Sequence, residues 1–404
     1  MRMIHLVCRV IIHALCFKWT GLQQRHACFR LVLFNKVIYM GRVFSPFVIS
    51  TFLLLVGFSG GMSAQMYEDT WQSVKTYPAQ PGINLAVNNK YGSVLVTIWD
   101  RDSVKIEVTR KIFEKSRDRL NTLRDNIDID YQVFSNGLSV ETVFGSRHSS
   151  LVRDLREMAN LSLSDSRSRI DYKIYLPAHA NLKITNKYGN VVLPSMDGKV
   201  NVDLSNGDFQ ARDLNGEVNL TLAFGKAILG HLKKGVVSLN FVDFSGEHME
   251  QLQLEGRSSE IKIQSVDVLD LTSRRDKVEV AKAGSVVADG YFSSLKFLEV
   301  ERQASLKLTY GELTHMVLTH TIQQCDIVSQ TCNVNLTLLN PLPYRARVRQ
   351  TRGSISLPAS VQKGETTSQM RNDLDFETFF FGRKDAANKF NINISDSELK
   401  INHQ

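Results

Sequence analysis

Apolar residues occupy every second position over long stretches of this chain. They do so over residues 83–87 and 94–98, and again over 104–108 after a short polar break. Period-two alternation bounded by Gly, Asn and Asp is typical of β-strands with one buried face. The same alternation continues from residue 182 to about 340, where no helical period interrupts it. An all-β fold is therefore predicted.

The turns between these strands repeat. The tetrapeptide Asn-Lys-Tyr-Gly occurs at residues 89–92 and 186–189, and glycines then recur in steps of 18. Gly311 lies 86 residues after Gly225, which fits five steps of about 17 residues. A short fixed period is typical of one strand-turn unit stacked on copies of itself. The predicted turn motif consists of Asn89, Lys90, Tyr91, Gly92, Asn186, Lys187, Tyr188, Gly189, Gly207, Gly225 and Gly311.

These patterns predict a β-solenoid-like stack of 17–18-residue repeats over residues 181–340, with a folded-over β-sandwich as the alternative. An N-terminal β region is expected over 65–180, with one short amphipathic helix at 113–127 and a mobile loop at 145–168. Residues 341–404 are expected to be a C-terminal β cap, because a solenoid must cover its last open edge. Between 242 and 294 the turn glycine is lost, so the register there stays open.

The N-terminal segment predicts export. Residues 40–64 combine a short basic start, a 12-residue apolar run and a small-residue cleavage site between Ala64 and Gln65, as a secretory signal peptide does. The alternative is an uncleaved N-terminal anchor, although the run is shorter than the roughly 20 residues that a transmembrane helix needs. Residues 1–39 are interpreted as a mis-assigned upstream extension before Met40, or as part of a long signal region.

The net charge of +8 does not indicate a nucleic-acid ligand. Residues 1–64 contain seven Lys or Arg and no Asp or Glu, so the remainder is close to neutral with both signs interspersed. A basic face for polyanions is therefore not expected, and nucleic acid is excluded as a partner. No integral membrane span is expected in the mature chain.

Two cysteines follow the signal segment, Cys325 and Cys332. In an oxidising compartment they could form a small disulfide loop, and the alternative is two free buried thiols on neighbouring strands. His315 and His320 lie at no recognised ligand spacing from them. No metal and no cofactor is predicted.

Catalytic chemistry is sought mainly among the carboxylates. Asp197, Asp203, Asp208 and Asp213 lie close in sequence, and clustered carboxylates are what polysaccharide-acting enzymes on β-helices need. Three of them fall at turns, where Asp is favoured for backbone hydrogen bonding. The His residues are scattered without an obvious partner. No catalytic residue is predicted, and a non-enzymatic protein is favoured.

Tyr91, Tyr188 and Tyr310 each precede a turn glycine. The simpler interpretation is that an aromatic ring packs over the turn while Gly supplies the backbone freedom of the corner. The functional alternative is a stacked row of rings that binds sugar or peptide.

The order of these elements resembles a known family. A signal segment leads to Asn-Lys-Tyr-Gly-x-Val at 89–94 and to a helix with Leu120 and Leu123, and a strand at 172–177 leads into the second Asn-Lys-Tyr-Gly. This is similar to the putative adhesin, or DUF4097-type, β-repeat proteins exported by Bacteroidetes, over roughly residues 75–400. The resemblance implies a solenoid-like fold and an envelope location, and it implies no ligand and no catalytic residue.

Three functions are compatible with these features. The favoured one is an exported, non-enzymatic protein of the cell envelope, in the periplasm or at the cell surface, with an adhesin-like binding or scaffold role toward an envelope protein or glycan. The alternatives are a polysaccharide-acting enzyme on a β-helix and a periplasmic accessory or sensor domain. Solvent-facing charges that alternate in sign along the strands favour the first over the enzyme.

Overall fold

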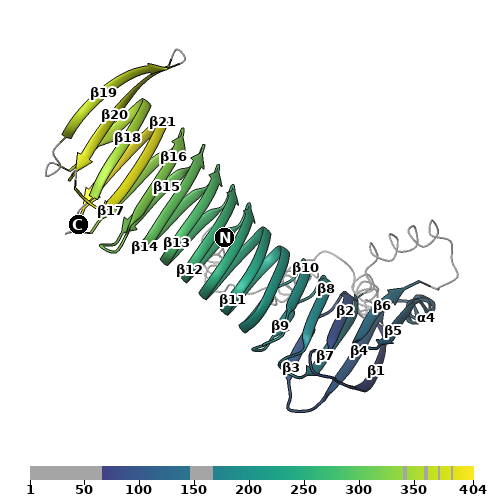
Figure 1. Ribbon diagram of the computed structural model, residues 1–404. Helices are drawn as coiled ribbons and strands as arrows, with labels where there is room; N and C mark the ends of the chain where they lie inside the picture. Colours follow the sequence, from purple (N-terminus) through teal and green to yellow (C-terminus); the bar gives the residue numbers. More distant parts are fainter. Residues whose placement is uncertain (1–65, 146–166, 340–343, 359–362, 372–373, 384) are drawn as a thin grey trace, which may run out of the picture. The chain divides into compact units, whose positions relative to one another are not determined.

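The computed structural model divides the chain into two units, residues 1–65 and 66–404. It describes residues 66–145, 167–339, 344–358, 363–371, 374–383 and 385–404. The predicted extension at 1–39, the signal at 40–64, the cleavage site Ala64–Gln65 and nearly all of the loop at 145–168 lie outside the described residues. Among the described residues of unit 66–404, 21 strands join into one hydrogen-bonded sheet, and one helix accompanies them (Figure 1).

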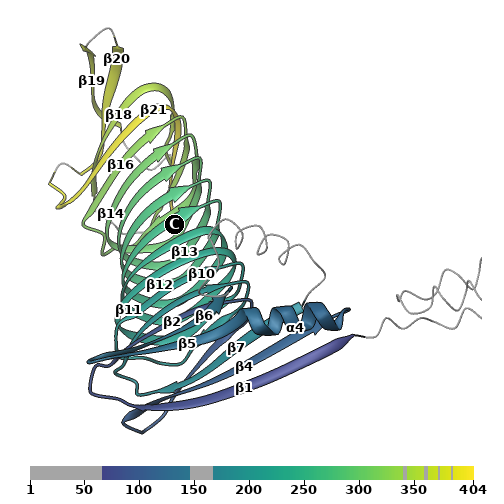
Figure 2. The ribbon, with the colours of Figure 1, turned by 90° about the vertical axis from the view of Figure 1, so that its right-hand side faces the viewer.

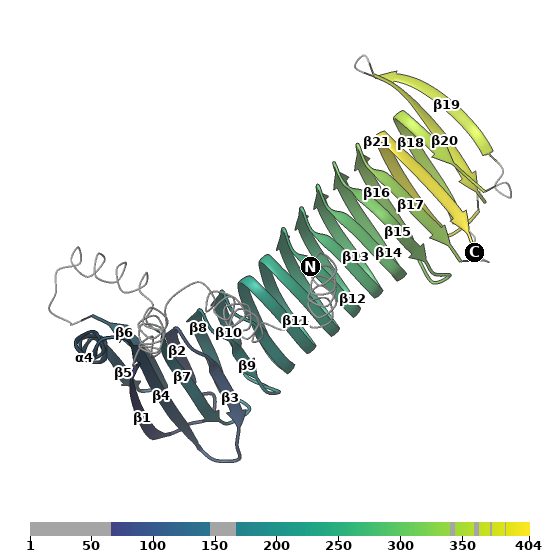
Figure 3. The ribbon, with the colours of Figure 1, turned by 180° about the vertical axis from the view of Figure 1, so that it is seen from behind.

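The middle of this unit is a stack of parallel coils (Figures 1 and 3). Val200 lies beside Leu182 on one side and Val218 on the other, each 18 residues away. Leu269 lies beside Leu252 and Val286, each 17 residues away. The coils comprise β8 (Asn181–Lys187), β9 (Val191–Leu193), β10 (Val200–Ser205), β11 (Phe209–Arg257), β12 (Glu260–Arg274), β13 (Lys277–Tyr291), β14 (Ser294–Thr309), β15 (Glu312–Leu318), β16 (Gln324–Gln330) and β17 (Asn333–Leu338).

This parallel register confirms the predicted solenoid-like stack of 17–18-residue repeats. A folded-over sandwich would pair its strands mainly as antiparallel neighbours. In the stretch between 242 and 294, where the register was left open, Phe244, Ile261, Val278 and Leu295 lie in one column, and the pairing of β13 with β14 shifts by one residue between Ala283 and Ser285.

The core is a continuous column of inward-facing apolar side chains. Along one strand, Val200, Val202 and Leu204 are buried while Asn201 and Asp203 between them are exposed. Burying a Val or Leu side chain stabilises the fold by about 1.5–3 kcal/mol. Each coil contributes several such residues, and each covers the apolar face that its neighbour leaves open.

An N-terminal region covers the first coil. Its elements are β1 (Tyr67–Pro78), β2 (Asn84–Lys90), β3 (Val94–Ile98), β4 (Ser103–Glu114), α4 (Arg117–Asn126), β5 (Ile127–Phe134), β6 (Gly137–Phe144) and β7 (Arg167–Leu176). Strands β2 and β3 form the first coil against β8 and β9, and their outer edges pair with β6 and β7. Strand β7 pairs antiparallel with β4, and β4 pairs antiparallel with β1. Strand β6 pairs antiparallel with β5 (Figure 2).

The one helix of the described residues is shorter than the predicted 113–127. It spans Arg117–Asn126 and buries Leu120 and Leu123. Phe113 belongs instead to β4, where it pairs with Glu68 of β1, and Ile127 begins β5. The apolar spacing from Phe113 to Ile127 therefore comes from three elements: the end of β4, the helix and the start of β5. Strand pairing therefore overrides the helical period at both ends.

The C-terminal end departs from chain order. Its strands are β18 (Tyr344–Ser356), β19 (Lys363–Arg371), β20 (Leu374–Gly382) and β21 (Asn388–His403). Strand β21 pairs in parallel with β16 and β17 on one side and with β18 on the other. Strands β19 and β20 form an antiparallel pair that joins the outer edge of β18 through β20. The last residues of the chain therefore form an inner coil, and an earlier segment forms the outermost one.

Candidate functional site: an aromatic corner of the solenoid

One corner of the stack has an unusual backbone. All twelve non-glycine residues with positive φ in the described part of the chain have φ between 49° and 65°. The strand pairings place them in one line along the stack; for example, their preceding residues Lys187, Lys90 and Ser205 are paired. We call this line the left-handed column. In stack order it contains Tyr91, Tyr188, Asn206, Phe224, Phe241, Ser258, Arg275, Phe292, Tyr310, Thr331, Asp396 and Arg352.

Half of the left-handed column is aromatic, although aromatic residues make up 9% of the chain. A left-handed backbone costs an L-residue roughly 1–2 kcal/mol, and Asn or Asp adopts it more readily than a bulky side chain. The turn alone would therefore favour residues such as Asn206 or Asp396 over Tyr and Phe. Residues in sparsely populated backbone regions cluster at functional sites.

The glycines of the predicted motif have a different role from the expected one. The positive φ belongs to the preceding residue, Tyr91 or Tyr188, so Gly does not supply the freedom of the corner. A Cβ on Gly189 would lie 1.9 Å from the carbonyl oxygen of Gly92, and one on Gly207 would lie 2.1 Å from that of Gly189. Glycine is required there because the backbone of the neighbouring coil leaves no room for a side chain.

Other coils carry a hydrogen-bonding side chain at the glycine position. We call these residues the inner ladder: Ser259, Asp276, Ser293, Cys332 and Ser397. Ser259 Oγ accepts the Val242 N–H at 3.1 Å, Asp276 Oδ1 accepts that of Ser259 at 2.7 Å, and Ser293 Oγ accepts that of Asp276 at 3.2 Å. Cys332 Sγ accepts the Gly311 N–H at 3.2 Å, and Ser397 Oγ accepts that of Cys332 at 3.1 Å.

The buried Asp276 carboxylate is held by several donors. Besides the Ser259 N–H, it accepts the Ser273 hydroxyl at 2.8 Å and the Arg274 N–H at 2.9 Å. Burial nevertheless raises the pKa of this carboxyl above its ordinary value of 3.8. Burial likewise raises the pKa of the Cys325 thiol. Cys325 and Cys332 are both buried and both free thiols.

The two Asn-Lys-Tyr-Gly copies lie directly beside each other on neighbouring coils. Asn89 and Asn186 point inward and are buried, and Nδ2 of Asn186 donates to the carbonyl oxygens of Gly92 and Gly189 at 3.0 and 2.9 Å. Gly207 and Gly225 follow on the next two coils, and Gly311 lies five coils beyond Gly225. The Asn and Gly positions therefore hold the corner, and the tyrosines face outward.

The column's aromatic rings form three stacked pairs. Tyr91 and Tyr188 have centroids 5.4 Å apart with planes inclined by 11°. Phe224 and Phe241 lie 5.4 Å apart at 7°. Phe292 and Tyr310 lie 5.2 Å apart at 18°, and Tyr291 contacts both of them edge-on. Stacked pairs contribute about 0.5–1.5 kcal/mol beyond burial, which offsets only part of the backbone cost of two left-handed aromatics.

These rings are open to solvent. The exposed fractions are 52% for Tyr188, 50% for Phe224, 53% for Phe241, 49% for Phe292 and 44% for Tyr310. Lys90 Nζ lies 4.7 Å from the centroid of the Tyr91 ring. Short or polar column residues separate the pairs: Asn206 between the first and second, and Ser258 with Arg275 between the second and third. We call the six aromatic residues of the left-handed column the aromatic corner.

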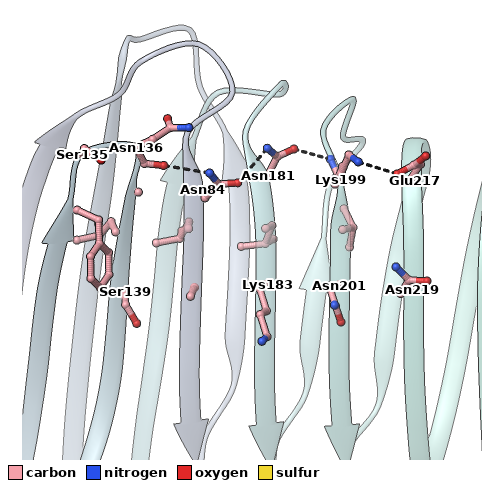
Figure 4. A pocket seen from close by; sticks show the side chains of 17 residues that line it. Asn84, Ser135, Asn136, Ser139, Asn181, Lys183, Lys199, Asn201, Glu217 and Asn219 are labelled. Atoms are coloured by element: carbon pink, nitrogen blue, oxygen red, sulfur yellow. Dashed lines mark hydrogen bonds and ion pairs between the residues drawn. The ribbon is translucent and has the colours of Figure 1, made fainter.

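A shallow groove also runs over the outer face of β2, β6, β8, β10 and β11 (Figure 4). Its volume is about 570 Å³, and a second hollow of about 430 Å³ shares Glu217 and Asn219 with it. Its rim groups bind one another: Asn181 Nδ2 donates to Asn84 Oδ1 at 3.1 Å, and Lys199 Nζ lies 2.7 Å from Glu217 Oε2. The groove is a weaker candidate than the aromatic corner, since the polar groups on its rim already bind one another.

Three of the four candidate carboxylates form hydrogen bonds at turns. Asp208 Oδ1 accepts the Lys226 N–H at 3.0 Å, Asp213 Oδ2 accepts the Ser195 hydroxyl at 2.7 Å, and Asp197 Oδ1 accepts from Asn215 Nδ2 at 2.8 Å. Asp203 lies on the outer face of β10 between Thr185 and Thr221. Three of the four thus support turns, as the sequence interpretation favoured. Across the described ranges, no three His, Cys, Asp or Glu residues form a group that could hold a metal ion.

Sequence reasoning missed one pair of histidines. His231 and His248 stack with centroids 5.4 Å apart. His231 Nε2 lies 3.1 Å from Glu250 Oε1, and His248 Nδ1 lies 2.8 Å from Ser265 Oγ. The signal was present as a spacing of 17 residues, which brings His231, His248 and Ser265 onto consecutive coils.

No family model and no curated protein matches this chain. It is similar to two solved structures. One is a putative cell adhesion protein from Clostridium sporogenes ATCC 15579, with 11% identity, 83% of this chain and 100% of that chain covered, and a TM-score of 0.18. The other is a putative adhesin from Bacteroides fragilis NCTC 9343, with 8% identity, 83% and 97% covered, and a TM-score of 0.23.

At these TM-scores the two solved structures say nothing about the function of this chain. The DUF4097-type resemblance and the assignment to Bacteroidetes stay predictions. Within the described residues, the structure has no helix with the length and apolar character needed to cross a membrane.

Proposed function

We propose that this chain is an exported, non-enzymatic binding protein of the cell envelope and that the aromatic corner is its binding surface. One observation carries the proposal. Six residues of the left-handed column are Tyr or Phe, at positions where the backbone favours Asn, and five of these six are 44–53% exposed. Exposed aromatic residues are enriched where proteins bind partners. Its ligand is an envelope glycan or protein.

The non-enzymatic part of the proposal is supported by the hydrogen bonds that three of the candidate carboxylates make at turns. A glycoside-cleaving site needs two carboxyl groups about 5–9.5 Å apart on either side of the scissile bond. Asp197, Asp208 and Asp213 each accept hydrogen bonds that hold turns of neighbouring coils. Export is supported by the signal-like segment at 40–64.

The test replaces aromatic residues of the column by Asn. Asn relieves the left-handed strain and loses the stacking, so the free energy of unfolding of Phe224→Asn should stay within about 1 kcal/mol of wild type. Binding of the purified protein to isolated envelope material should fall at least about tenfold when Tyr188, Phe224, Phe241, Phe292 and Tyr310 are all changed to Asn. The matched control is Lys262→Asn, an exposed change away from the corner.

Three outcomes would contradict the proposal. Unchanged binding by the fivefold variant would exclude the aromatic corner. A decrease of more than about 2 kcal/mol in the free energy of unfolding of single Asn variants would show that the rings stabilise the fold. Release of reducing ends from envelope polysaccharide by the wild-type protein would show that it is an enzyme. Cell fractionation and N-terminal sequencing, with Gln65 as the expected first residue, test export.

A further inference from the structure

The aromatic corner contains a gap of one coil. Tyr188 and Phe224 lie two coil steps apart, and the coil between them carries Asn206 at the same column position. Neighbouring strands are spaced by about 4.8 Å, so the two rings lie roughly 10 Å apart along the stack. All three residues are exposed. The gap therefore has two aromatic walls and an amide floor.

The walls are fixed by the rings behind them. Tyr188 stacks on Tyr91 at 11°, and Phe224 stacks on Phe241 at 7°. Each of these pairs occupies one face of the wall ring and leaves the other face turned toward the gap. Rings held in this way lose little conformational freedom when a ligand enters, and such preorganisation favours binding.

We propose that Tyr188, Asn206 and Phe224 form a slot that binds one pyranose ring of a glycan chain. This inference rests on the proposed function and names the ligand class of the aromatic corner. The distance between the Tyr188 and Phe224 rings decides which chemical group fits between them. Contact at about 3.5–4.0 Å from each wall takes up 7–8 Å and leaves roughly 2–3 Å for the occupant's own thickness. A flat aromatic group would leave voids, whereas a puckered saturated ring with its substituents fills this space.

The polar groups around the slot suit a sugar. The Asn206 amide lies on the floor, with Ser205 before it and the exposed Asp208 carboxylate two residues after it. Asp208 is held in place because its Oδ1 accepts the Lys226 N–H and its own N–H donates to Asn190 Oδ1, both at 3.0 Å. Hydroxyl groups at the edge of a pyranose can donate to the carboxylate and exchange hydrogen bonds with the amide, while C–H groups on its two faces contact the rings.

The next gap in the column differs. Phe241 and Phe292 are separated by two coils, which carry Ser258 and Arg275, so their rings lie roughly 14 Å apart. One sugar ring cannot touch both walls of that gap. Phe292 and Tyr310 have no intervening coil. Both places share the left-handed backbone and the exposed rings of the slot, and they differ from it in spacing and in the residues between the rings.

The experiment measures sugar binding before and after a larger side chain blocks the slot. The full purified protein is titrated with cello-, xylo-, manno- and chitohexaose, and binding is followed by calorimetry and by saturation transfer from aromatic protons to sugar C–H protons. At least one hexaose is expected to bind the wild type. In Asn206→Phe a ring occupies the gap and stacks on both walls, so binding should fall at least about tenfold without loss of thermal stability. Tyr188→Asn and Phe224→Asn should weaken binding similarly, while Lys262→Asn, an exposed change outside the aromatic corner, should change it less than about twofold.

The outcomes separate the slot from the proposed function. If Asn206→Phe binds the hexaose as wild type does, the slot is wrong. If no hexaose binds more tightly than about 5 mM while the wild type still binds envelope material through the aromatic corner, the pyranose ligand is wrong and the proposed binding function stands. If the fivefold Asn variant also binds envelope material unchanged, the proposed function itself has failed.

Discussion

Three positions at the corner of each coil carry three separate requirements. The inward residue two positions before the column residue is polar or apolar, and the column residue is left-handed. The residue after it is Gly or a member of the inner ladder, except after Phe241, where it is Val242. The sequence pattern located the turn through Tyr188-Gly189. It could not show which of the two residues has positive φ, because Tyr rarely adopts that backbone and Gly adopts it freely.

The inner ladder predicts which replacements of Asp276 are tolerated. Asp276→Ser should change the free energy of unfolding by less than about 1 kcal/mol, because Ser259 and Ser293 make the same N–H contact on adjacent coils. Asp276→Ala should cost about 3 kcal/mol, since two buried donors and one part-buried donor lose their acceptor. Urea denaturation of the two variants checks this, and equal losses in both would contradict a shared ladder.

The wild type and Asp276→Ser should also differ in how their free energies of unfolding depend on pH. The pKa of Asp276 is raised in the folded state, so folding favours the protonated carboxyl. Its stabilising contribution is full below the ordinary value of 3.8 and is lost as the pH rises through the raised pKa. The free energy of unfolding of the wild type should therefore decrease relative to Asp276→Ser as the pH rises from about 3.8. Denaturation between pH 3 and 7 tests this, and a constant difference would contradict it.

Glycine variants test the crowding at the corner. Gly207→Ala should lower the free energy of unfolding by at least about 2 kcal/mol, because its Cβ would lie 2.1 Å from the Gly189 carbonyl oxygen. Gly82→Ala is the control: its φ is +74°, but no atom lies within 4 Å of the added Cβ. It should cost only about 1 kcal/mol of backbone strain. Equal costs would show that strain, and not the neighbouring coil, requires the motif glycines.

At the scale of elements, alternation identified strands but not their partners. The strand pattern near Phe390 and Ile394 was visible in the sequence, and its place between β16 and β18 was not. Pairing depends on contacts across about 65 residues, which a local pattern does not encode. The helix was found from Leu120 and Leu123, and its ends were misplaced because Phe113 and Ile127 obey strand pairing instead.

Removing β21 should damage more than the end of the stack. Deleting residues 388–404 uncovers the inner edges of β16 and β17 and separates β18 from the coils. Exposed strand edges promote aggregation, so the truncated protein should be largely insoluble or elute as large species in size-exclusion chromatography. Deleting Gln404 alone removes one hydrogen bond to the Leu338 carbonyl and should leave the protein monodisperse. A soluble, compact form lacking β21 would contradict this role.

At the scale of the molecule, unit 66–404 is a one-dimensional stack in which each coil contacts mainly its two neighbours. Deleting one coil, residues 258–274, should therefore leave a folded protein, because Val242 can then donate to Asp276 in place of Ser259. The free energy of unfolding should fall by about 1–3 kcal/mol, with a smaller denaturant m value. Circular dichroism and urea titration measure both. Loss of the cooperative transition would contradict independent coils.

This deletion also changes the spacing of the aromatic corner. Phe241 and Phe292 would then be two coil steps apart, with Arg275 between them. That is the spacing of Tyr188 and Phe224, so a second sugar slot should appear, and the hexaose titration should show a higher stoichiometry. An unchanged stoichiometry would indicate that the floor residue matters more than the distance between the walls.

Because β21 lies between β18 and the strands β16 and β17, the coils of the stack can form only in a fixed order. A chain leaving a ribosome or a translocation channel presents its N-terminal coils first, so most of the stack can grow one coil at a time from the end built by β2 and β3. The position beside β16 and β17 must stay vacant until residues 388–403 emerge, because only they occupy it. Growth from one end therefore stops before the last two coils, and the tip closes in a single late step once residues 388–403 are available.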